Sequence, residues 1–222
     1  MTPSAVLFDI DGTLIDSNFL HIEAWAHAFA RLGLTVPAWR IQRSIGADSD
    51  KLLDGLIGEA PEDVRARAKS LHSEYYEQST PRLNVFDGAR ELVAAIAAHG
   101  TRVVLATSAP RDELDRLLPV LDIDEQIHAV TSGEDVETAK PRPDIIEVAL
   151  ERAGVDASRA FMVGDSVWDI AAADRAGVRC IGVLSGGTGA DDLRKAGAVA
   201  VYDDVAALLD GVETSPLAEL WA

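Results

Sequence analysis

Two aspartates near the N-terminus are the residues best placed to do chemistry. Asp9 and Asp11 stand two positions apart, directly after the apolar run 5–8. Two carboxylates at the end of a buried strand carry a large desolvation cost unless a cation compensates them. A divalent cation with oxygen ligands would supply that compensation. The pair therefore predicts a metal site at a strand end.

The pattern does not fit a calcium-binding loop. Such a loop needs an acidic or amide side chain at its fifth position, Gly at its sixth and Glu at its twelfth. Thr13, Leu14 and Leu20 occupy these positions. An ordinary aspartate turn without a metal stays open as the alternative.

Two later stretches carry groups that could bind phosphate, one after an apolar run and one before an amphipathic stretch. Thr107, Ser108 and Ala109 follow the run 102–106, where a hydroxyl and backbone N–H groups can donate to phosphate oxygens. Ser108 could instead cap the helix that follows. Lys140 precedes two prolines that restrict the backbone, so it could hold a charge near a phosphate or remain solvated.

The run 160–163 leads to two further acids. Asp165 comes where a strand carboxylate can reach the same cation as Asp9. Asp169 has two interpretations, because Ser166 and Asp169 match a capping box and Asp169 could also support the metal.

These residues need a scaffold that brings strand ends together. Short apolar runs alternate with amphipathic stretches, and we expect strands at 5–8, 102–106, 129–131, 160–163, 180–184 and 199–202, with helices at 89–99, 112–121 and 144–153. Strands that are apolar on both faces indicate a parallel sheet flanked by helices, an α/β Rossmann-like arrangement. Ligands of such sheets bind at the carboxyl ends of the strands.

Residues 17–83 show a different pattern. Apolar residues recur at helical spacing in the stretches 22–32, 52–57 and 64–75, and no strand pattern interrupts them. We therefore expect an all-helical cap at 17–83, inserted after the first strand, and an α/β core made of 1–16 and 84–222. The last residues, 214–222, receive no assignment.

Composition narrows the partners. The formal net charge is −17, with 37 acidic and 20 basic residues among 222. Such a surface repels nucleic acid and anionic membranes. We expect a small-molecule partner, a monomer or small homo-oligomer and, since no signal peptide or membrane-spanning run is present, a cytoplasmic location. Cys180 lies in an apolar stretch and is interpreted as a buried thiol.

Together the motifs resemble those of the haloacid dehalogenase-like superfamily of phosphohydrolases. The stretch 9–13, Asp-Ile-Asp-Gly-Thr, is similar to the nucleophile loop of that superfamily. Thr107 and Lys140 resemble its second and third motifs, and the Gly-Asp-x-x-x-Asp stretch at 164–169 resembles its fourth. The helical insertion is similar to the small C1-type cap of the phosphoglycolate phosphatase and β-phosphoglucomutase branch.

The resemblance implies a magnesium-dependent phosphatase acting on a small phosphate ester. It implies that Asp9, the backbone carbonyl of Asp11 and Asp165 hold Mg²⁺, with Asp169 in support. Asp9 would attack phosphorus and become an aspartyl phosphate, and Asp11 would serve as proton donor and acceptor. Lys140 and Thr107 would bind the phosphate oxygens, next to Gly12, Ser108 and Ala109.

The cap should decide the substrate. His21 resembles the histidine that couples cap closure to the general acid in the mutases, or it is an ordinary polar position. Gly46 allows close approach to the site. β-Phosphoglucomutases place an arginine shortly after that glycine, whereas Ala, Asp and Ser occupy 47–49 here, which favours a hydrolase. Arg43 or Lys51 could still supply a cation, so a mutase stays the alternative.

Two other classes of protein are weighed. A receiver-like domain would only accept a phosphate on Asp9, but it needs a durable acyl phosphate, and Asp11 and the cap weigh against it. No G-x-G-x-x-G motif follows the first strand, which weighs against a dinucleotide-binding module.

Overall fold

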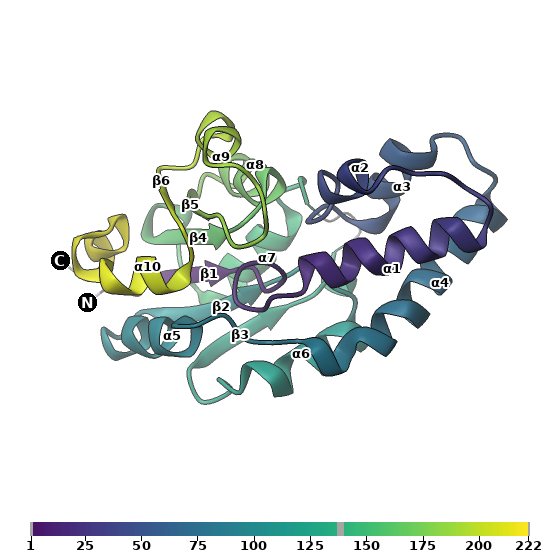
Figure 1. Ribbon diagram of the computed structural model, residues 1–222. Helices are drawn as coiled ribbons and strands as arrows, with labels where there is room; N and C mark the ends of the chain where they lie inside the picture. The colour runs from purple at the N-terminus through teal and green to yellow at the C-terminus, as the bar shows by residue number, and fades with distance from the viewer. Residues whose placement is uncertain (1, 137–139, 222) are drawn as a thin grey trace.

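A six-stranded parallel sheet forms the centre of the molecule (Figure 1). The computed structural model describes residues 2–136 and 140–221. Residues 1, 137–139 and 222, which belong to the predicted core, lie outside the described residues. The strands lie in the order β3-β2-β1-β4-β5-β6, and their bounds are β1 Ala5–Phe8, β2 Arg102–Ala106, β3 Ile127–Thr131, β4 Ala160–Gly164, β5 Arg179–Val183 and β6 Ala200–Tyr202. The predicted α/β class with a parallel sheet is confirmed.

Both faces of the sheet are covered, as the apolar strands require. Along β1, Val6 and Phe8 pack into one apolar layer, and Ala5 and Leu7 pack into the other. This alternation follows from the two-residue period of a strand. The first layer is closed by α5 (Ala89–Ala98), α6 (Arg111–Leu121) and α10 (Val205–Asp210), and the second by α7 (Asp144–Ala153), α8 (Val167–Arg175) and α9 (Ala190–Ala196).

Four strands differ from their predicted bounds by one or two residues: β4 ends one residue later, β5 begins and ends one residue earlier, and both edge strands begin at other positions. β3 begins at Ile127 instead of position 129, because this edge strand is only partly buried and His128 is exposed. At the other edge, β6 begins at Ala200 and leaves Val199 exposed. The unassigned C-terminal stretch contains a short 3₁₀ helix at Pro216–Leu220. Cys180 is a buried free thiol on β5, as predicted.

Between β1 and α5 the chain forms helices that extend away from the sheet (Figure 1). These are α1 (Asn18–Arg31), α2 (Ala38–Gln42), α3 (Ser49–Ile57) and α4 (Glu62–Ser79). Helices α1 and α4 lie side by side, and this cap has an apolar cluster of its own formed by Trp25, Phe29, Ile41, Leu52, Leu53, Leu56 and Ala68.

Two details of the cap were not predicted. The short helix α2 buries only Ile41, so no repeating apolar pattern announces it. On α4 the predicted face included Tyr75, but Tyr76 is the fully buried tyrosine and Tyr75 is half-buried. Within residues 2–136 and 140–221, none of the helices has the length and apolar character needed to cross a membrane.

Candidate active site

The carboxyl ends of β1, β2 and β4 bring distant residues to one place. Asp9 follows β1, Thr107 follows β2 and Asp165 follows β4, and all three side chains are buried. Lys140 reaches the same point, and its Nζ lies 2.6 Å from Asp9 Oδ1. The structure thus brings together the residues that the sequence predicted to lie near one another.

Three carboxylates gather at this point, and two of them contact the lysine. One oxygen from each of Asp9, Asp165 and Asp169 lies within 4.8 Å of the others, and Lys140 Nζ also lies 2.7 Å from Asp169 Oδ1. We call these four residues the Asp9 cluster. A single ammonium group cannot balance three buried carboxylates, and hard oxygen donors at such spacing suit a metal cation.

The electrostatics of the Asp9 cluster reflect this imbalance. Burial raises the pKa of Asp9 to about 7, against the opposing charge of Lys140 and with help from the negative charge of Asp169. Burial and the charges of Asp169 and Asp9 raise the pKa of Asp165 well above its usual value. Burial alone would lower the pKa of Lys140, but Asp169 and Asp9 raise it overall, so the lysine stays charged.

Asp165 is held by residues from the first loop and the first cap helix. Its Oδ1 accepts a hydrogen bond from Thr13 Oγ1 at 3.2 Å, and its Oδ2 accepts one from Asn18 Nδ2 at 2.8 Å. Gly12 and Gly186 make room for this contact, because a Cβ on either would collide with Asn18 and Asp165. Gly12 also adopts a φ of 75°, which favours glycine.

Asp169 combines local and distant contacts. Its Oδ2 accepts hydrogen bonds from Ser166 N at 3.1 Å and Ser166 Oγ at 2.6 Å, while Ser166 Oγ accepts one from Asp169 N. This is the capping box that the sequence predicted at the start of α8. Because Asp169 Oδ1 faces Lys140, the capping role does not exclude support of a metal.

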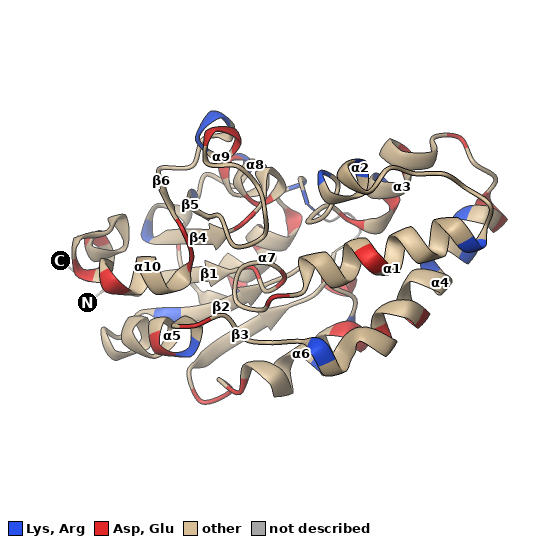
Figure 2. Ribbon diagram, in the orientation of Figure 1, with Lys and Arg blue, Asp and Glu red and all other residues tan. Residues whose placement is uncertain are grey.

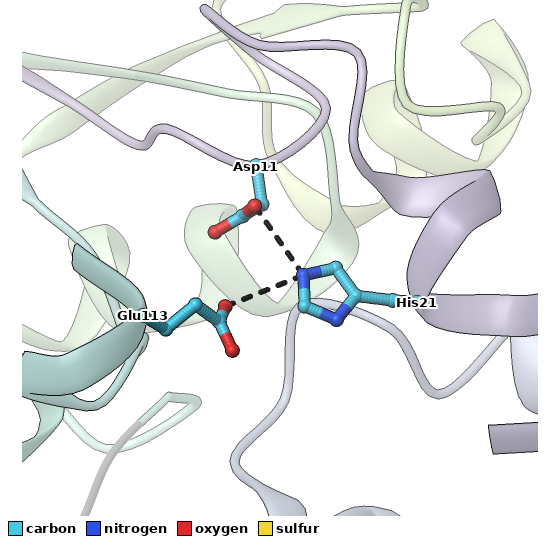
Figure 3. A group of neighbouring side chains, drawn as sticks. All are labelled: Asp11, His21 and Glu113. Carbon is cyan, nitrogen blue, oxygen red and sulfur yellow. Dashed lines mark hydrogen bonds and ion pairs between the residues drawn. The ribbon is translucent and has the colours of Figure 1, made fainter. Parts of the chain in front are cut away.

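A second group of charged side chains surrounds Asp11 (Figure 3). His21 Nε2, from α1, lies 3.4 Å from Asp11 Oδ1 and 3.3 Å from Glu113 Oε1 on α6. Ser17 Oγ donates a hydrogen bond to Asp11 Oδ1 at 2.5 Å. The Asp11 cluster, as we call it, comprises Asp11, Ser17, His21, His72 and Glu113.

His21 is not an ordinary surface position. Burial alone would lower its pKa, but the charges and hydrogen bonds of Glu113 and Asp11 raise it to about 10. Its ring stacks on Tyr76 with centroids 3.9 Å apart, and its Nδ1 lies 3.1 Å from His72 Nε2. Burial and the charge of His21 hold the pKa of His72 well below its usual value, so a neutral His72 accepts from a protonated His21.

Asp11 therefore differs electrostatically from Asp9. Burial alone would raise the pKa of Asp11, but the hydrogen bond and charge of His21 and the hydrogen bond from Ser17 lower it overall. Asp11 is a carboxylate paired with an imidazolium, whereas Asp9 is poised to exchange a proton near neutral pH.

The loop after β2 offers donors to a ligand. Thr107 Oγ1 accepts a hydrogen bond from Ala109 N at 3.0 Å, which fixes this turn. Ser108 does not cap α6, because Pro110 is the N-cap residue. Instead, Ser108 Oγ is buried without a hydrogen-bond partner among the described residues, next to the cavity.

A cavity of about 600 Å³ separates the strand ends from the cap. Its size suits a small metabolite. Both clusters reach it, and its lining includes Asp9, Asp11, Thr107, Ser108, Ala109 and Glu113 from the core and His21, Trp25, Gly46, Lys69 and His72 from the cap.

The predicted cap residues divide into two groups. Gly46 lines the cavity with a φ of 90°, and a Cβ there would lie 2.7 Å from Ser166 Oγ, so glycine permits the cap loop to approach the core. Arg43 is exposed and places its guanidinium over the ring of Trp39, outside the cavity lining. Lys51 is also exposed and outside the lining.

Sequence reasoning missed Asn18, Lys69, His72, Tyr76 and Glu113. A signal for Glu113 existed, since it occupies the same helical face as Leu114 and Leu117 and an acid on an apolar stripe is unusual. His72 likewise follows Leu71 on the buried face of α4. Asn18 and Lys69 carry no comparable signal, because polar residues at helix starts and on half-exposed faces are common.

Comparison with known proteins defines the class. Residues 6–183 match the model of the haloacid dehalogenase-like hydrolase family, and the chain belongs to this family. The resemblance predicted from the strand-end motifs is confirmed.

Individual relatives cover nearly the whole chain. A phosphoglycolate phosphatase of Rhodospirillum rubrum is 32% identical over 94% of this chain and 90% of its own length. The crystal structure of a hydrolase from Pseudomonas syringae has a TM-score of 0.91 at 30% identity, covering 95% of this chain and 98% of that one. A β-phosphoglucomutase from Clostridium difficile, at 18% identity, has a TM-score of 0.80 over 92% of both chains, so the fold is shared with mutases.

Proposed function

We propose that this protein is a magnesium-dependent phosphatase that hydrolyses a small phosphate monoester through an aspartyl phosphate on Asp9. The observation that carries the proposal is the placement of Asp9 at the cavity, 2.6 Å from Lys140 and grouped with two more buried carboxylates. The phosphatase from R. rubrum, 32% identical to this chain, supports the same activity class.

The donor set fits a magnesium ion. Asp9 and Asp165, together with the backbone carbonyl of Asp11, would hold it, and Asp169, which lies near both and contacts Lys140, would support it. Burial, with the neighbouring carboxylates, raises the pKa values of Asp9 and Asp165, and a bound cation would favour their ionised forms. When bound, Mg²⁺ supplies positive charge that reduces the repulsion between the Asp9 carboxylate and a phosphate.

The residues of the core perform the phosphoryl transfer. Asp9, ionised, attacks phosphorus in line with the ester oxygen and forms the aspartyl phosphate. Lys140 neutralises the charge on the phosphate oxygens, and the hydroxyl groups of Thr107 and Ser108 donate hydrogen bonds to them. The unpartnered Ser108 Oγ at the cavity supports this role.

Asp11 handles the proton. In the free protein it is ionised beside the protonated His21. A phosphate dianion that enters the cavity adds negative charge next to Asp11, which raises its pKa and favours its protonated form. Asp11 then gives the proton to the leaving alkoxide and later takes one from the water that hydrolyses the aspartyl phosphate.

We also propose the predicted division into a core of 1–16 and 84–222 and a cap of 17–83. The apolar cluster within the cap supports it. Lid-like closure over a cavity of about 600 Å³ suits a compact metabolite rather than a macromolecule. A cytoplasmic location and a monomer or small homo-oligomer stay predictions.

A mutase is the second candidate, and its fold is shared. The placement of Arg43 outside the cavity lining weakens it, because a mutase must hold the distal phosphate of a bisphosphate intermediate. A receiver-like domain is weakened by the Asp11 cluster, which places an acid–base pair beside the acyl phosphate that such a domain must preserve.

The deciding experiment measures inorganic phosphate released from a panel of small phosphate esters, with Mg²⁺ and with a chelator. We expect release only with Mg²⁺. Conversion of a sugar 1-phosphate to its 6-phosphate without phosphate release would establish a mutase. A stable phosphoprotein without turnover of any ester would establish a receiver.

A further inference from the structure

The mouth of the cavity is acidic on both sides. Outside the two clusters, its charged lining residues are Asp48 and Asp50 on the cap, Asp112 and Glu134 on the core, and Lys69 on α4. Four carboxylates thus face one ammonium group among the described residues. Figure 2 shows that acidic residues are spread over both parts of the molecule. Outside the lining, Arg65 lies 3.6 Å from Asp50 and Arg116 lies 3.8 Å from Asp112, whereas Asp48 and Glu134 form no ion pair among the described residues, so the lining keeps an excess of negative charge.

Lys69 is itself neutralised. Its Nζ lies 2.7 Å from Asp50 Oδ1, and Arg65, which does not line the cavity, lies 3.6 Å from the same carboxylate oxygen. The hydrogen bond from Lys69 lowers the pKa of Asp50, so the carboxylate is ionised and holds the ammonium group. An incoming anion would have to displace Asp50 to reach Lys69.

The two other cationic side chains near the cavity, His21 and Lys140, are also paired with carboxylates. His21 is placed between Asp11 and Glu113, and Lys140, which lies outside the lining, is placed between Asp9 and Asp169. No arginine lines the cavity within the described part of the chain. A second anionic group on the substrate would therefore meet carboxylates without a free cation.

We infer that the alcohol released from the substrate is uncharged or positively charged, bearing hydroxyl or amino groups, and carries no carboxylate or second phosphate. The inference rests on the proposed phosphatase function and deepens it. A field of one sign, focused in a cleft, attracts or repels a ligand charge over several ångströms. A substrate of this kind would separate this chain from relatives named phosphoglycolate phosphatase, because the alcohol released from phosphoglycolate carries a carboxylate.

Three esters of matched size test the inference. They are 2-hydroxyethyl phosphate, 2-aminoethyl phosphate and 2-phosphoglycolate, which differ in one terminal group that is neutral, positive or negative. We expect kcat/KM for 2-phosphoglycolate to be roughly tenfold below that for 2-hydroxyethyl phosphate, and 2-aminoethyl phosphate to equal or exceed the neutral ester. The difference should shrink as salt is raised. A preference for 2-phosphoglycolate would overturn the inference.

A pair of double variants assigns the effect to the cavity mouth. Asp112→Asn with Glu134→Gln should raise kcat/KM for 2-phosphoglycolate relative to 2-hydroxyethyl phosphate by roughly threefold or more, since two repelling charges are removed. Asp124→Asn with Glu125→Gln removes the same charge from exposed positions outside the lining and should leave the ratio unchanged. Equal shifts in both double variants would overturn the inference.

Failure of the proposed function would look different. If no ester is turned over, the dissociation constants of the three esters for the Mg²⁺-loaded wild-type protein still rank the terminal groups. Weakest binding of 2-phosphoglycolate would then support the charge inference while the phosphatase proposal fails. Tightest binding of 2-phosphoglycolate would overturn it independently of turnover.

Discussion

The Asp9 cluster and the Asp11 cluster lie at the same cavity but balance their charges in opposite ways. The Asp9 cluster groups three carboxylates around Lys140, all from the core, and is left with excess negative charge. The Asp11 cluster joins residues of the cap to residues of the core and pairs two carboxylates with a protonated His21.

The difference teaches how one loop carries two roles. Asp9 and Asp11 are two positions apart, yet the pKa of Asp9 is raised to about 7 and that of Asp11 is lowered. Burial raises the pKa of both carboxyl groups, and the partners decide whether it is outweighed. Lys140 does not offset burial at Asp9, where Asp169 and Asp11 oppose it, whereas the imidazolium of His21 and the hydroxyl of Ser17 stabilise ionised Asp11. Asp9, whose pair with Lys140 does not offset burial, is suited to act as a nucleophile beside a bound metal, and Asp11, whose pair with His21 does, is suited to act as the acid–base group.

The largest expected effect removes the nucleophile. Asp9→Asn should lower kcat at least about 10⁴-fold, because an amide cannot form the acyl phosphate. Phosphate release measured with Mg²⁺ checks this. Asp16→Asn, an exposed acid in the same loop, is the matched control and should stay near wild type. Comparable losses in both variants would contradict the role of Asp9 as the nucleophile.

Removal of the acid–base group should give a smaller and different loss. We expect Asp11→Asn to lower turnover roughly 10²- to 10³-fold. With p-nitrophenyl phosphate, whose leaving group needs no proton, the variant should still release one equivalent of nitrophenolate in a burst before a slow steady state. Stopped-flow absorbance measures the burst. A loss of turnover without a burst would show that Asp11, like Asp9, is needed to form the aspartyl phosphate.

The third prediction concerns stability and pH. His21 has a pKa raised to about 10 in the folded protein, so its stabilisation is complete below its unfolded value of about 6.5 and is lost as pH rises toward 10. His21→Gln should lower the free energy of unfolding by roughly 3 kcal/mol near pH 6, and the deficit should narrow toward pH 9.

Urea unfolding at several pH values measures this deficit. The control is His99→Gln, which loses an exposed pair with Glu213 and should change stability by less than about 1 kcal/mol. A His21→Gln deficit that is constant across this pH range would contradict the pairing of His21 with Asp11 and Glu113.

The pH dependence of Mg²⁺ affinity tests the Asp9 cluster. Because the pKa of Asp9 is about 7, a metal that uses its carboxylate must displace a proton at lower pH. Affinity for Mg²⁺ should therefore rise with pH by about tenfold per unit below 7 through Asp9, and more steeply wherever Asp165 also gives up a proton. Titration calorimetry at several pH values measures this, and pH-independent affinity would argue against Asp9 as a ligand.

The smallest expected effect tests the support of Asp165. Asn18→Ala removes the amide that donates to Asp165 Oδ2 at 2.8 Å and should weaken Mg²⁺ binding about tenfold. Asn84→Ala removes an exposed amide that contacts only the nearby Arg82 carbonyl and is the control. Equal Mg²⁺ affinity of the two variants would show that Asn18 does not position the metal carboxylate.

Much of the core could be read from the sequence because its signals are local. Apolar runs of strand length, separated by amphipathic helices, predicted β1 and β2 with their observed bounds. The predicted start of β3 was wrong because an edge strand is buried on fewer sides and tolerates the exposed His128. The short helix α2 was not predicted, since a single buried residue gives no repeating apolar pattern.

The site residues followed a similar division. Asp9 and Asp165 could be predicted to meet, because the carboxyl ends of parallel strands face one edge of the sheet, and Lys140 was expected beside them from its resemblance to the third motif. Arg43 shows the limit of the method, since its position in the cap loop suggested the cavity while its side chain packs on Trp39. Loop side chains follow contacts that sequence spacing does not encode.

The sequence by itself determined the parallel sheet, the family and the two aspartates of the first loop, because hydrophobic periodicity and short motifs are properties of neighbouring residues. Only the tertiary structure decided that Glu113 and His21 meet at Asp11, that Asn18 reaches Asp165, and that the cavity mouth is acidic. Charges interact through space, so the proton affinity of a carboxylate depends on which distant side chains the fold brings near it.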